Sequence, residues 1–210
     1  MSMENGLESI SKVLEWAYEK AVTGGIPGTD SAYEMADEYM KQEGTLTDRV
    51  NSLIRWQNAK CATSGFITGL GGLITLPVTV PANVSSVIYI QLRMIAAIAI
   101  MGGHDIKDDK VKTLVFACLC GNSMVDVLKD VGIQVGKKLA EQALKNLSYE
   151  VIKKINAAVG FRLVTKFSQA GLVNLSKVIP LVGGMVSGTI DGISCNIIGN
   201  AARDTFIQES

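Results

Sequence analysis

Residues 64–103 read SGFITGLGGLITLPVTVPANVSSVIYIQLRMIAAIAIMGG, and we expect the rest of the chain to be arranged around them. This stretch holds a single charged residue, Arg93, while glycines crowd its first half and Ile, Ala, Val and Met fill its second half. Pro77 and Pro81 interrupt it, because a helix does not continue easily through proline. A stretch so poor in charge is typical of a protein core or of contact with a bilayer.

The composition favours a single domain that is either deeply buried or associated with a membrane. The chain has 210 residues, which is enough to bury a core without cross-links. Only 19% of the residues are charged and the mean hydropathy is +0.27, whereas soluble domains have about 25% charged residues. The 20 basic and 20 acidic side chains cancel, so we expect no nucleic-acid partner.

The charges are unevenly distributed along the chain. Residues 1–60 carry six basic and ten acidic side chains, a net charge of −4. Residues 129–177 carry nine basic and three acidic side chains, a net charge of +6. We interpret residues 1–60 as acidic N-terminal helices that pack on a helical core formed by residues 61–210, within one domain.

Hydrophobic spacing predicts helices along the first part of the chain. Apolar residues at helical intervals predict a helix from about residue 5 to residue 22. Ser31, followed three residues later by Glu34, is a capping-box pattern that opens a second helix. A third helix is predicted to start at Thr45, and residues 82–101 predict a further helix that is apolar almost all round.

The second half of the chain also reads as helical. We expect Asp105 to cap the next helix, whose apolar pattern runs from Val111 to about Val131. Between residues 133 and 147 a further helix is predicted, and we expect Ser148 to cap the helix after it. The residues that line one face of the first are Ile133, Gly136, Leu139, Ala143, Leu144 and Leu147. Because no stretch shows the alternation of a strand, the sequence predicts an all-α, single-domain helical bundle with two glycine-rich apolar segments packed at its centre.

Those two segments are residues 64–81 and 180–199, and we expect their glycine faces to pack on each other. Small residues three or four positions apart let helix backbones approach closely. Arg93 and Asp191 are each the only charge in a long apolar stretch, and a buried lone charge is costly unless it is paired. We hypothesise that they meet; the alternative is that each bonds separately to backbone or solvent. The residues assigned a structural or interaction role are Gly65, Gly69, Gly72, Pro77, Pro81, Arg93, His104, Asp105, Pro180, Gly184, Gly188, Asp191, Gly192 and Gly199.

No signature of a catalytic, metal or cofactor site is present, so we expect none of the three. His104 is the single histidine, and the neighbouring Asp105 is expected to be occupied by capping. The HExxH, GxSxG and P-loop patterns are absent. The four cysteines show neither CxxC nor zinc spacing, so we expect small buried hydrophobic residues in a reducing compartment.

The basic region, residues 129–177, predicts either a solvated face or contact with an anionic membrane surface. A polar, acidic N-terminus without a signal peptide predicts a cytoplasmic protein, at the cytoplasmic face of the inner membrane if it binds lipid. The lysines predicted to contact lipid are Lys137, Lys138, Lys153 and Lys154.

The sequence leaves open whether residues 64–103 insert in a bilayer. Residues 82–101 have the length of a membrane-spanning helix. Arg93 near the centre of that helix would cost about 2.5–3.5 kcal/mol on insertion scales. We therefore keep two arrangements, a soluble or peripheral protein and an integral hairpin.

Three motifs carry a resemblance to a known family. Residues 72–81 read GLITLPVTVP, residues 89–99 read YIQLRMIAAIA and residues 179–184 read IPLVGG. In this order, over roughly residues 50–208, they resemble the bacterial EcsC family. His104 departs from the tyrosine expected in that family, which weakens any catalytic role for this histidine.

What the resemblance implies is an accessory role near membranes. The family is named for a protein encoded beside an ABC transporter, its molecular function is poorly defined, and it supplies no catalytic residue. We therefore expect a non-enzymatic, membrane-associated accessory or interaction protein with a membrane-protein partner, linked to a transporter or other membrane machinery. The alternatives are a membrane-proximal hydrolase, which needs polar residues converging near His104, Asp105 or Asp191, and a soluble helical binder of a lipid or apolar ligand.

Overall fold

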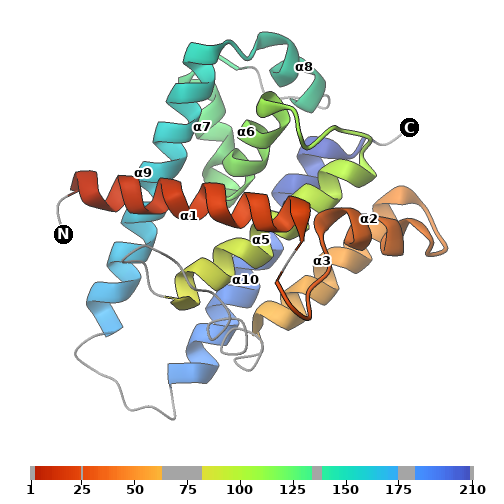
Figure 1. Ribbon diagram of the computed structural model, residues 1–210, viewed down its shortest axis with the longest axis horizontal. Helices are drawn as coiled ribbons and strands as arrows, with labels where there is room; N and C mark the ends of the chain where they lie inside the picture. The colour runs from red at the N-terminus through yellow and green to blue at the C-terminus, as the bar shows by residue number, and fades with distance from the viewer. Residues whose placement is uncertain (1–2, 25, 63–81, 134–138, 175–182, 209–210) are drawn as a thin grey trace.

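The computed structural model describes residues 3–24, 26–62, 82–133, 139–174 and 183–208 (Figure 1). In these residues the chain forms nine α-helices, one short 3-10 helix and no strand, which confirms the predicted all-α class. The helices are α1 (Met3–Thr23), α2 (Ala32–Met40), α3 (Leu46–Ala62), α5 (Ala82–Met101), α6 (Asp109–Cys118), η1 (Gly121–Ser123), α7 (Met124–Asp130), α8 (Leu139–Asn146), α9 (Tyr149–Asn174) and α10 (Gly183–Phe206).

Helix α5 lies at the centre of the bundle because nearly all of its sides are apolar. Every residue from Ser85 to Ala99 is buried. Helices α1, α2, α3, α6 and α10 all contact α5. In Figure 1, α1 crosses in front of α5 and α10 runs behind it. The most apolar of the described helices is therefore covered by elements from both halves of the chain.

The predictions for the first three helices are confirmed. Helix α1 covers the predicted range, and its buried side includes Val13 and Ala17. At the start of α2, the Glu34 N–H donates to Ser31 Oγ at 3.2 Å, while the Ser31 N–H donates to the Glu34 carboxylate at 2.8 Å. Each of two otherwise unpaired backbone donors is satisfied in this capping box.

The prediction of one helical run from Val111 to about Val131 is wrong. Helix α6 ends at Cys118, and α7 begins only at Met124. Between them Gly121 has a φ of +55°, a conformation that glycine adopts readily. A Cβ on Gly121 would lie 2.9 Å from the side chain of Ile197 on α10. The chain breaks its helix here because α10 packs directly against the turn.

The prediction that Asp105 caps the next helix is also wrong. Asp108 is the N-cap of α6, and its carboxylate accepts a hydrogen bond from the Lys110 N–H at 2.7 Å. Asp105 instead accepts the Lys107 N–H at 2.9 Å, in the turn that precedes the helix. Each aspartate carboxylate accepts the N–H of the residue two positions ahead. Asp108 caps the helix and Asp105 does not, because only Asp108 directly precedes the first residue of α6.

The predicted contact between two glycine faces falls largely outside the described residues. Residues 63–81 and 175–182 are outside them, and so are the side chains of residues 183–193. Gly199 is described, and a Cβ there would lie 2.9 Å from the side chain of Ile54. At this position α10 therefore approaches α3 closely. The predicted residues that fall outside the description are Gly65, Gly69, Gly72, Pro77, Pro81 and Pro180.

Two further predictions are not tested by the structure. One is the division into N-terminal helices, residues 1–60, and a helical core, residues 61–210. The other concerns insertion of residues 64–103, of which residues 64–81 lie outside the description. Within the part of the chain that is described, no helix combines the length and the hydropathy of a membrane-spanning segment.

Candidate functional site

Arg93 is a buried cation on the central helix α5. Its side chain is only 1% exposed. One guanidinium nitrogen, Nη1, donates to the backbone carbonyl of Asp30 at 3.0 Å, and Cζ lies 5.4 Å from the centroid of the Tyr89 ring. Among the described residues, the buried Nε atom has no hydrogen-bond partner. The described contacts of Arg93 are therefore those with Asp30 and Tyr89.

Tyr89 and Arg93 together hold the connection between α1 and α2. They are four residues apart on α5 and so lie on the same face of the helix. The hydroxyl groups of Tyr89 and Thr29 share a hydrogen bond of 2.8 Å, and Arg93 binds the carbonyl of Asp30 next to it. These contacts place the start of α2 against the core.

The predicted ion pair between Arg93 and Asp191 stays a prediction. The backbone of Asp191 belongs to α10, but its side chain lies outside the described residues. The alternative, that Arg93 bonds to a backbone carbonyl, matches its contact with Asp30. Lys60, at the end of α3, is a second cation nearby. Burial lowers the pKa of Lys60, and the positive charge of Arg93 lowers it further.

His104 and Asp105 lie together at the end of α5, but other contacts occupy them. The His104 ring packs edge-on against Phe206, with ring centroids 5.3 Å apart. The Asp105 carboxylate accepts the backbone N–H of Lys107. No group of three or more histidine, cysteine, aspartate or glutamate side chains in the described ranges could hold a metal ion.

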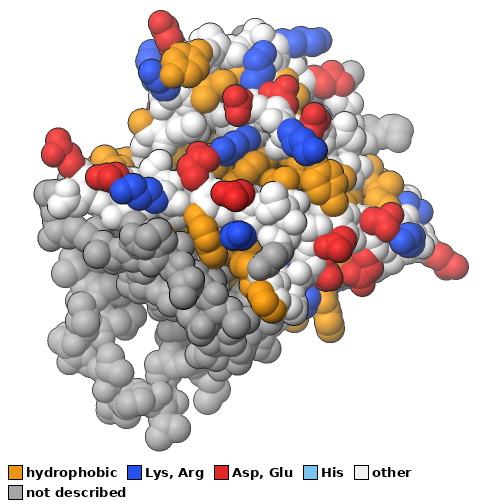
Figure 2. All heavy atoms as spheres, viewed as in Figure 1, with side chains coloured by type: hydrophobic (Ala, Val, Ile, Leu, Met, Phe, Trp, Pro, Cys, Tyr) orange, Lys and Arg blue, Asp and Glu red, His pale blue; other side chains and the backbone are white. Residues whose placement is uncertain are grey.

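Helix α9 exposes hydrophobic and basic side chains on one side. Tyr149 is 70% exposed and Phe161 is 51% exposed. Lys153 and Lys154 are exposed between them, and Lys153 Nζ lies 4.5 Å from the centroid of the Tyr149 ring. Figure 2 shows hydrophobic and basic side chains next to each other where α9 begins, at the top of the view. Of the predicted lipid-binding lysines, Lys137 and Lys138 lie outside the described residues.

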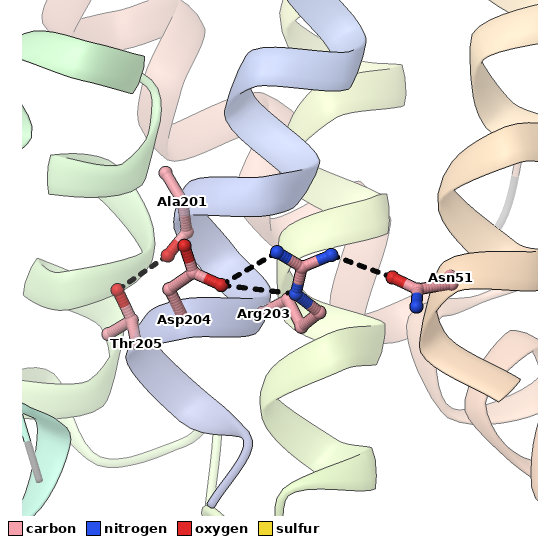
Figure 3. Close-up of polar contacts among 5 residues, drawn as sticks. All are labelled: Asn51, Ala201, Arg203, Asp204 and Thr205. Carbon is pink, nitrogen blue, oxygen red and sulfur yellow. Dashed lines mark hydrogen bonds and ion pairs between the residues drawn. The ribbon is translucent and has the colours of Figure 1, made fainter. Parts of the chain in front are cut away.

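Arg203 makes a polar link between α10 and α3 that sequence reasoning did not predict. Its Nη1 donates to Asn51 Oδ1 at 2.8 Å, and its Nε and Nη2 donate to Asp204 Oδ1 at 3.0 and 2.9 Å (Figure 3). Thr205 Oγ1 donates to the Ala201 carbonyl at 2.6 Å on the neighbouring turn. A basic residue in the last turn of an apolar helix was the available signal, but its partner on α3 is 152 residues away.

Two cavities lie beside the N-terminal helices. One of about 450 Å³ is between α2 and α3, and one of about 520 Å³ is between α1 and α6. Charged and aromatic side chains line both. The first is lined by Glu38, Tyr39, Gln42, Ser52, Arg55 and Trp56. The second is lined by Glu15, Trp16, Tyr18, Glu19, Val22, Thr23, Ile106, Lys107, Asp109 and Lys112.

Two of the four cysteines form a disulfide. Cys61 of α3 and Cys195 of α10 are joined, with their Cα atoms 6.8 Å apart and 134 residues between them in sequence. Both are buried, as expected, but their pairing was not predicted, because α3 and α10 pack along each other and bring distant cysteines together. Cys118 is buried as expected, and burial raises the pKa of its thiol to about 12.

Comparison with known proteins adds one finding. A model of the EcsC protein family matches residues 7–207, from the first turns of α1 to the end of α10. No curated protein and no solved structure matches the chain.

Proposed function

The chain belongs to the EcsC protein family, and from this premise we propose that it is a non-enzymatic accessory protein that binds anionic membrane surfaces. The observation that supports the proposal is the exposed side of α9. Tyr149, Lys153, Lys154 and Phe161 form this surface, which we call the α9 face.

The α9 face follows one broad side of the helix. At about 100° per residue, Lys153 lies about 40° and Phe161 about 120° round the helix from Tyr149. From Tyr149 to Phe161 the α9 face is about 18 Å long, at about 1.5 Å per residue. Lys154 lies beside Lys153 and widens it. A helix with this face can lie flat on a membrane surface.

The residue types on the α9 face suit the boundary between lipid headgroups and acyl chains. Tyrosine has an apolar ring and a polar hydroxyl, and lysine keeps its ammonium in water while its stem covers apolar surface. A basic residue near an anionic leaflet contributes about 1 kcal/mol. Two lysines therefore contribute roughly 2 kcal/mol, or roughly 30-fold in affinity.

A solvated face would account for the lysines, and single exposed aromatic residues are common on protein surfaces. Lipid contact is favoured because two exposed aromatic residues and two exposed lysines gather on one helix. Tyr149 and Phe161 lie at the two ends of the lysine pair, so lipid contact accounts for all four side chains together.

On this proposal the protein acts at the cytoplasmic face of the inner membrane. Its net charge of +6 over residues 129–177 adds to the attraction of the α9 face for anionic lipid. A peripheral protein placed there would serve a membrane-embedded partner, a transporter or other machinery, by holding its remaining surfaces close to the bilayer.

Sedimentation with vesicles tests the proposal. We expect the protein to bind phosphatidylcholine vesicles that contain phosphatidylserine, to bind pure phosphatidylcholine weakly, and to be released by salt. The double substitution Lys153→Glu with Lys154→Glu should reduce binding at least 30-fold, because each reversal replaces attraction by repulsion. A carbonate wash should release the protein from the lipid.

The matched control is Lys41→Glu with Lys107→Glu, two exposed lysines on other parts of the molecule. It changes the net charge equally but leaves the α9 face intact. Equal losses for the two double variants, or equal binding to both vesicle types, would contradict the proposal. Circular dichroism melting curves confirm that all variants are folded.

A further inference from the structure

Helices α2 and α3 border a surface cleft on the other side of the molecule from α9 (Figure 1). Its volume of about 450 Å³ is in the range of small-molecule sites. Tyr39 is the buried residue of its lining. The cleft also offers a second aromatic ring, a carboxylate, a guanidinium, an amide and a hydroxyl group. These come from Trp56, Glu38, Arg55, Gln42 and Ser52.

The cleft holds two opposite charges that are not paired with each other. Glu38 on α2 and Arg55 on α3 are both exposed. In the described ranges, neither takes part in an ion pair. Asp48, two turns before Arg55 on the same side of α3, accepts hydrogen bonds from Thr45 at the start of that helix. Both charged groups of the lining are therefore available to a ligand that enters the cleft.

The charges around the cleft differ between its two sides. Residues 31–45, which form α2 and its flanking residues, carry four acidic side chains and one basic side chain, a net charge of −3. Figure 2 shows acidic side chains gathered there, at the right of the view. On the α3 side, Arg55 is accompanied by Lys60, whose Nζ lies 5.8 Å from the centroid of the Trp56 ring. The α2 side is therefore negative and the α3 side is positive.

A cleft with one negative and one positive side favours a molecule that carries both charges. A zwitterion is attracted by both sides, whereas a simple cation or anion is attracted by one side and repelled by the other. Arginine binds carboxylate and phosphate oxygens through its planar fork, and a carboxylate binds an ammonium group through charge-assisted hydrogen bonds. Trp56, which is 58% exposed, offers an apolar ring to the rest of such a molecule.

From this lining we propose that the cleft between α2 and α3 binds a small zwitterion, a molecule with one ammonium group and one carboxylate or phosphate group. Glu38 binds the ammonium group, Arg55 binds the oxyanion, and Trp56 covers the apolar part. Free amino acids and the phosphoethanolamine headgroup of a lipid both carry this pair of charges. The site does not depend on membrane binding through the α9 face.

The first experiment is calorimetric titration of the full chain with the twenty common amino acids, one at a time, and with glycerophosphoethanolamine. We expect at least one of these zwitterions to bind saturably and to raise the melting temperature. Binding of an amino acid alone identifies a free amino acid as the ligand. Binding of glycerophosphoethanolamine alone identifies the lipid headgroup, and binding of both shows that the pair of charges is what the cleft recognises.

Analogues that lack one charge test whether both sides of the cleft are used. For an amino acid, the methyl ester lacks the carboxylate and the N-acetyl derivative lacks the ammonium group. For glycerophosphoethanolamine, the corresponding probes are ethanolamine and glycerol 3-phosphate. Each should bind the wild type about fivefold more weakly than the zwitterion, the effect of losing one exposed ionic contact.

Two variants assign the contacts. Arg55→Gln should bind the zwitterion no more tightly than the analogue without the oxyanion. Glu38→Gln should bind it no more tightly than the analogue without the ammonium group. The matched controls are Lys41→Gln and Glu43→Gln, at exposed positions nearby that do not line the cleft, and they should discriminate as the wild type does.

The proposal is overturned if no zwitterion binds the wild type, or if the singly charged analogues bind as tightly as the zwitterion. It is also overturned if Arg55→Gln and Glu38→Gln discriminate like the two controls. All four positions are exposed, so we expect the variants to fold, and circular dichroism melting curves check this. Sedimentation with vesicles should be the same for Arg55→Gln and the wild type, which separates this site from the α9 face.

Discussion

At the scale of single residues, Arg93 is the most informative position. It is the one charged residue of α5, whose residues from Ser85 to Ala99 are all buried. It is buried among α5, the Tyr89 ring and the Asp30 carbonyl, so removing it leaves polar groups unpaired and a void behind. The sequence predicted that Arg93 is a buried charge in need of a partner, because it is the only charged residue in a long apolar stretch. The carbonyl it binds was not readable, because Asp30 is 63 residues away.

The counter-ion of Arg93 can be tested by a double-mutant cycle. Arg93→Ala should destabilise the fold by about 3–5 kcal/mol, the usual cost of disrupting a buried charged group. If Arg93 is held by the Asp30 carbonyl and the Tyr89 ring and not by Asp191, the losses from Arg93→Ala and Asp191→Ala should add. Urea denaturation of the wild type, both single variants and the double variant measures this. A coupling above about 1 kcal/mol would instead support the predicted Arg93–Asp191 pair.

The capping box makes stability depend on pH. The pKa of Glu34 lies below its ordinary value of 4.5, because its carboxylate accepts hydrogen bonds from the backbone and then the side chain of Ser31. A depressed pKa contributes stability that is fully present above the unfolded value and is lost as pH falls through the folded value. We therefore expect the free energy of unfolding to decline with acid below about pH 4.5.

Glu34→Gln should make that decline shallower in urea denaturation across this pH range. Glu38→Gln, an exposed glutamate on the same helix but outside the capping box, should leave it unchanged. A decline of the same steepness in Glu34→Gln and the wild type would show that the capping box does not contribute to it.

At the scale of elements, the helix that the sequence misjudged depends on a single glycine. Gly121 interrupts the run between α6 and α7 with a φ of +55°, and a Cβ there would lie 2.9 Å from Ile197. The apolar pattern around it is compatible with a continuous helix, so periodicity alone could not show the break. The contact with α10, about 75 residues further along the chain, decides the conformation.

Two glycine substitutions separate backbone strain from packing. Gly121→Ala should cost about 2–3 kcal/mol, from the left-handed backbone together with the collision with Ile197. Gly132→Ala is the matched control, because Gly132 has a φ of +83° but no atom within 4 Å of its added Cβ. It should cost about 1 kcal/mol, from the backbone alone. Equal melting temperatures for the two variants would contradict the packing argument.

Local patterns predicted the elements well where local interactions decide them. Ser31 and Glu34 bind each other across three residues, so the start of α2 was visible in the sequence. Asp105 and Asp108 offer the same short-range bond, and the sequence did not tell which of them begins the helix. The exposed lysines of α9 were predicted, whereas the exposure of Tyr149 and Phe161 depends on which neighbours cover the helix.

At the scale of the whole molecule, the all-α class followed from composition and periodicity, but the pairing of the helices did not. Arg203 with Asn51 and Cys61 with Cys195 both join α3 to α10. These partners are far apart in sequence and follow no motif, so only the assembled fold brings them together. The contacts of Arg93 and Tyr89 are similar, since they join α5 to the connection before α2.

The disulfide should be a major contributor to the stability of the assembled fold. A cross-link between residues 134 positions apart restricts the unfolded chain over most of its length. We expect Cys61→Ser, or reduction of the wild type, to lower the free energy of unfolding by about 3–5 kcal/mol in urea denaturation. Cys118→Ser leaves the disulfide intact and serves as the control.

Non-reducing electrophoresis of the denatured protein should show the oxidised chain migrating faster than the reduced chain. Mass spectrometry after alkylation should find two modified cysteines before reduction and four after it. Four modified cysteines before reduction would contradict the disulfide.

The central position of α5 has a consequence for biosynthesis. A ribosome completes α5 at Met101 well before it begins α10 at Gly183, and α10 is one of the helices that cover α5. During that interval α5, the most apolar of the described helices, is not yet covered by α10. Exposed hydrophobic surface on nascent chains is what chaperones bind and what aggregation starts from. Chains interrupted before Gly183 should therefore depend on chaperones to stay in solution far more than the finished protein does.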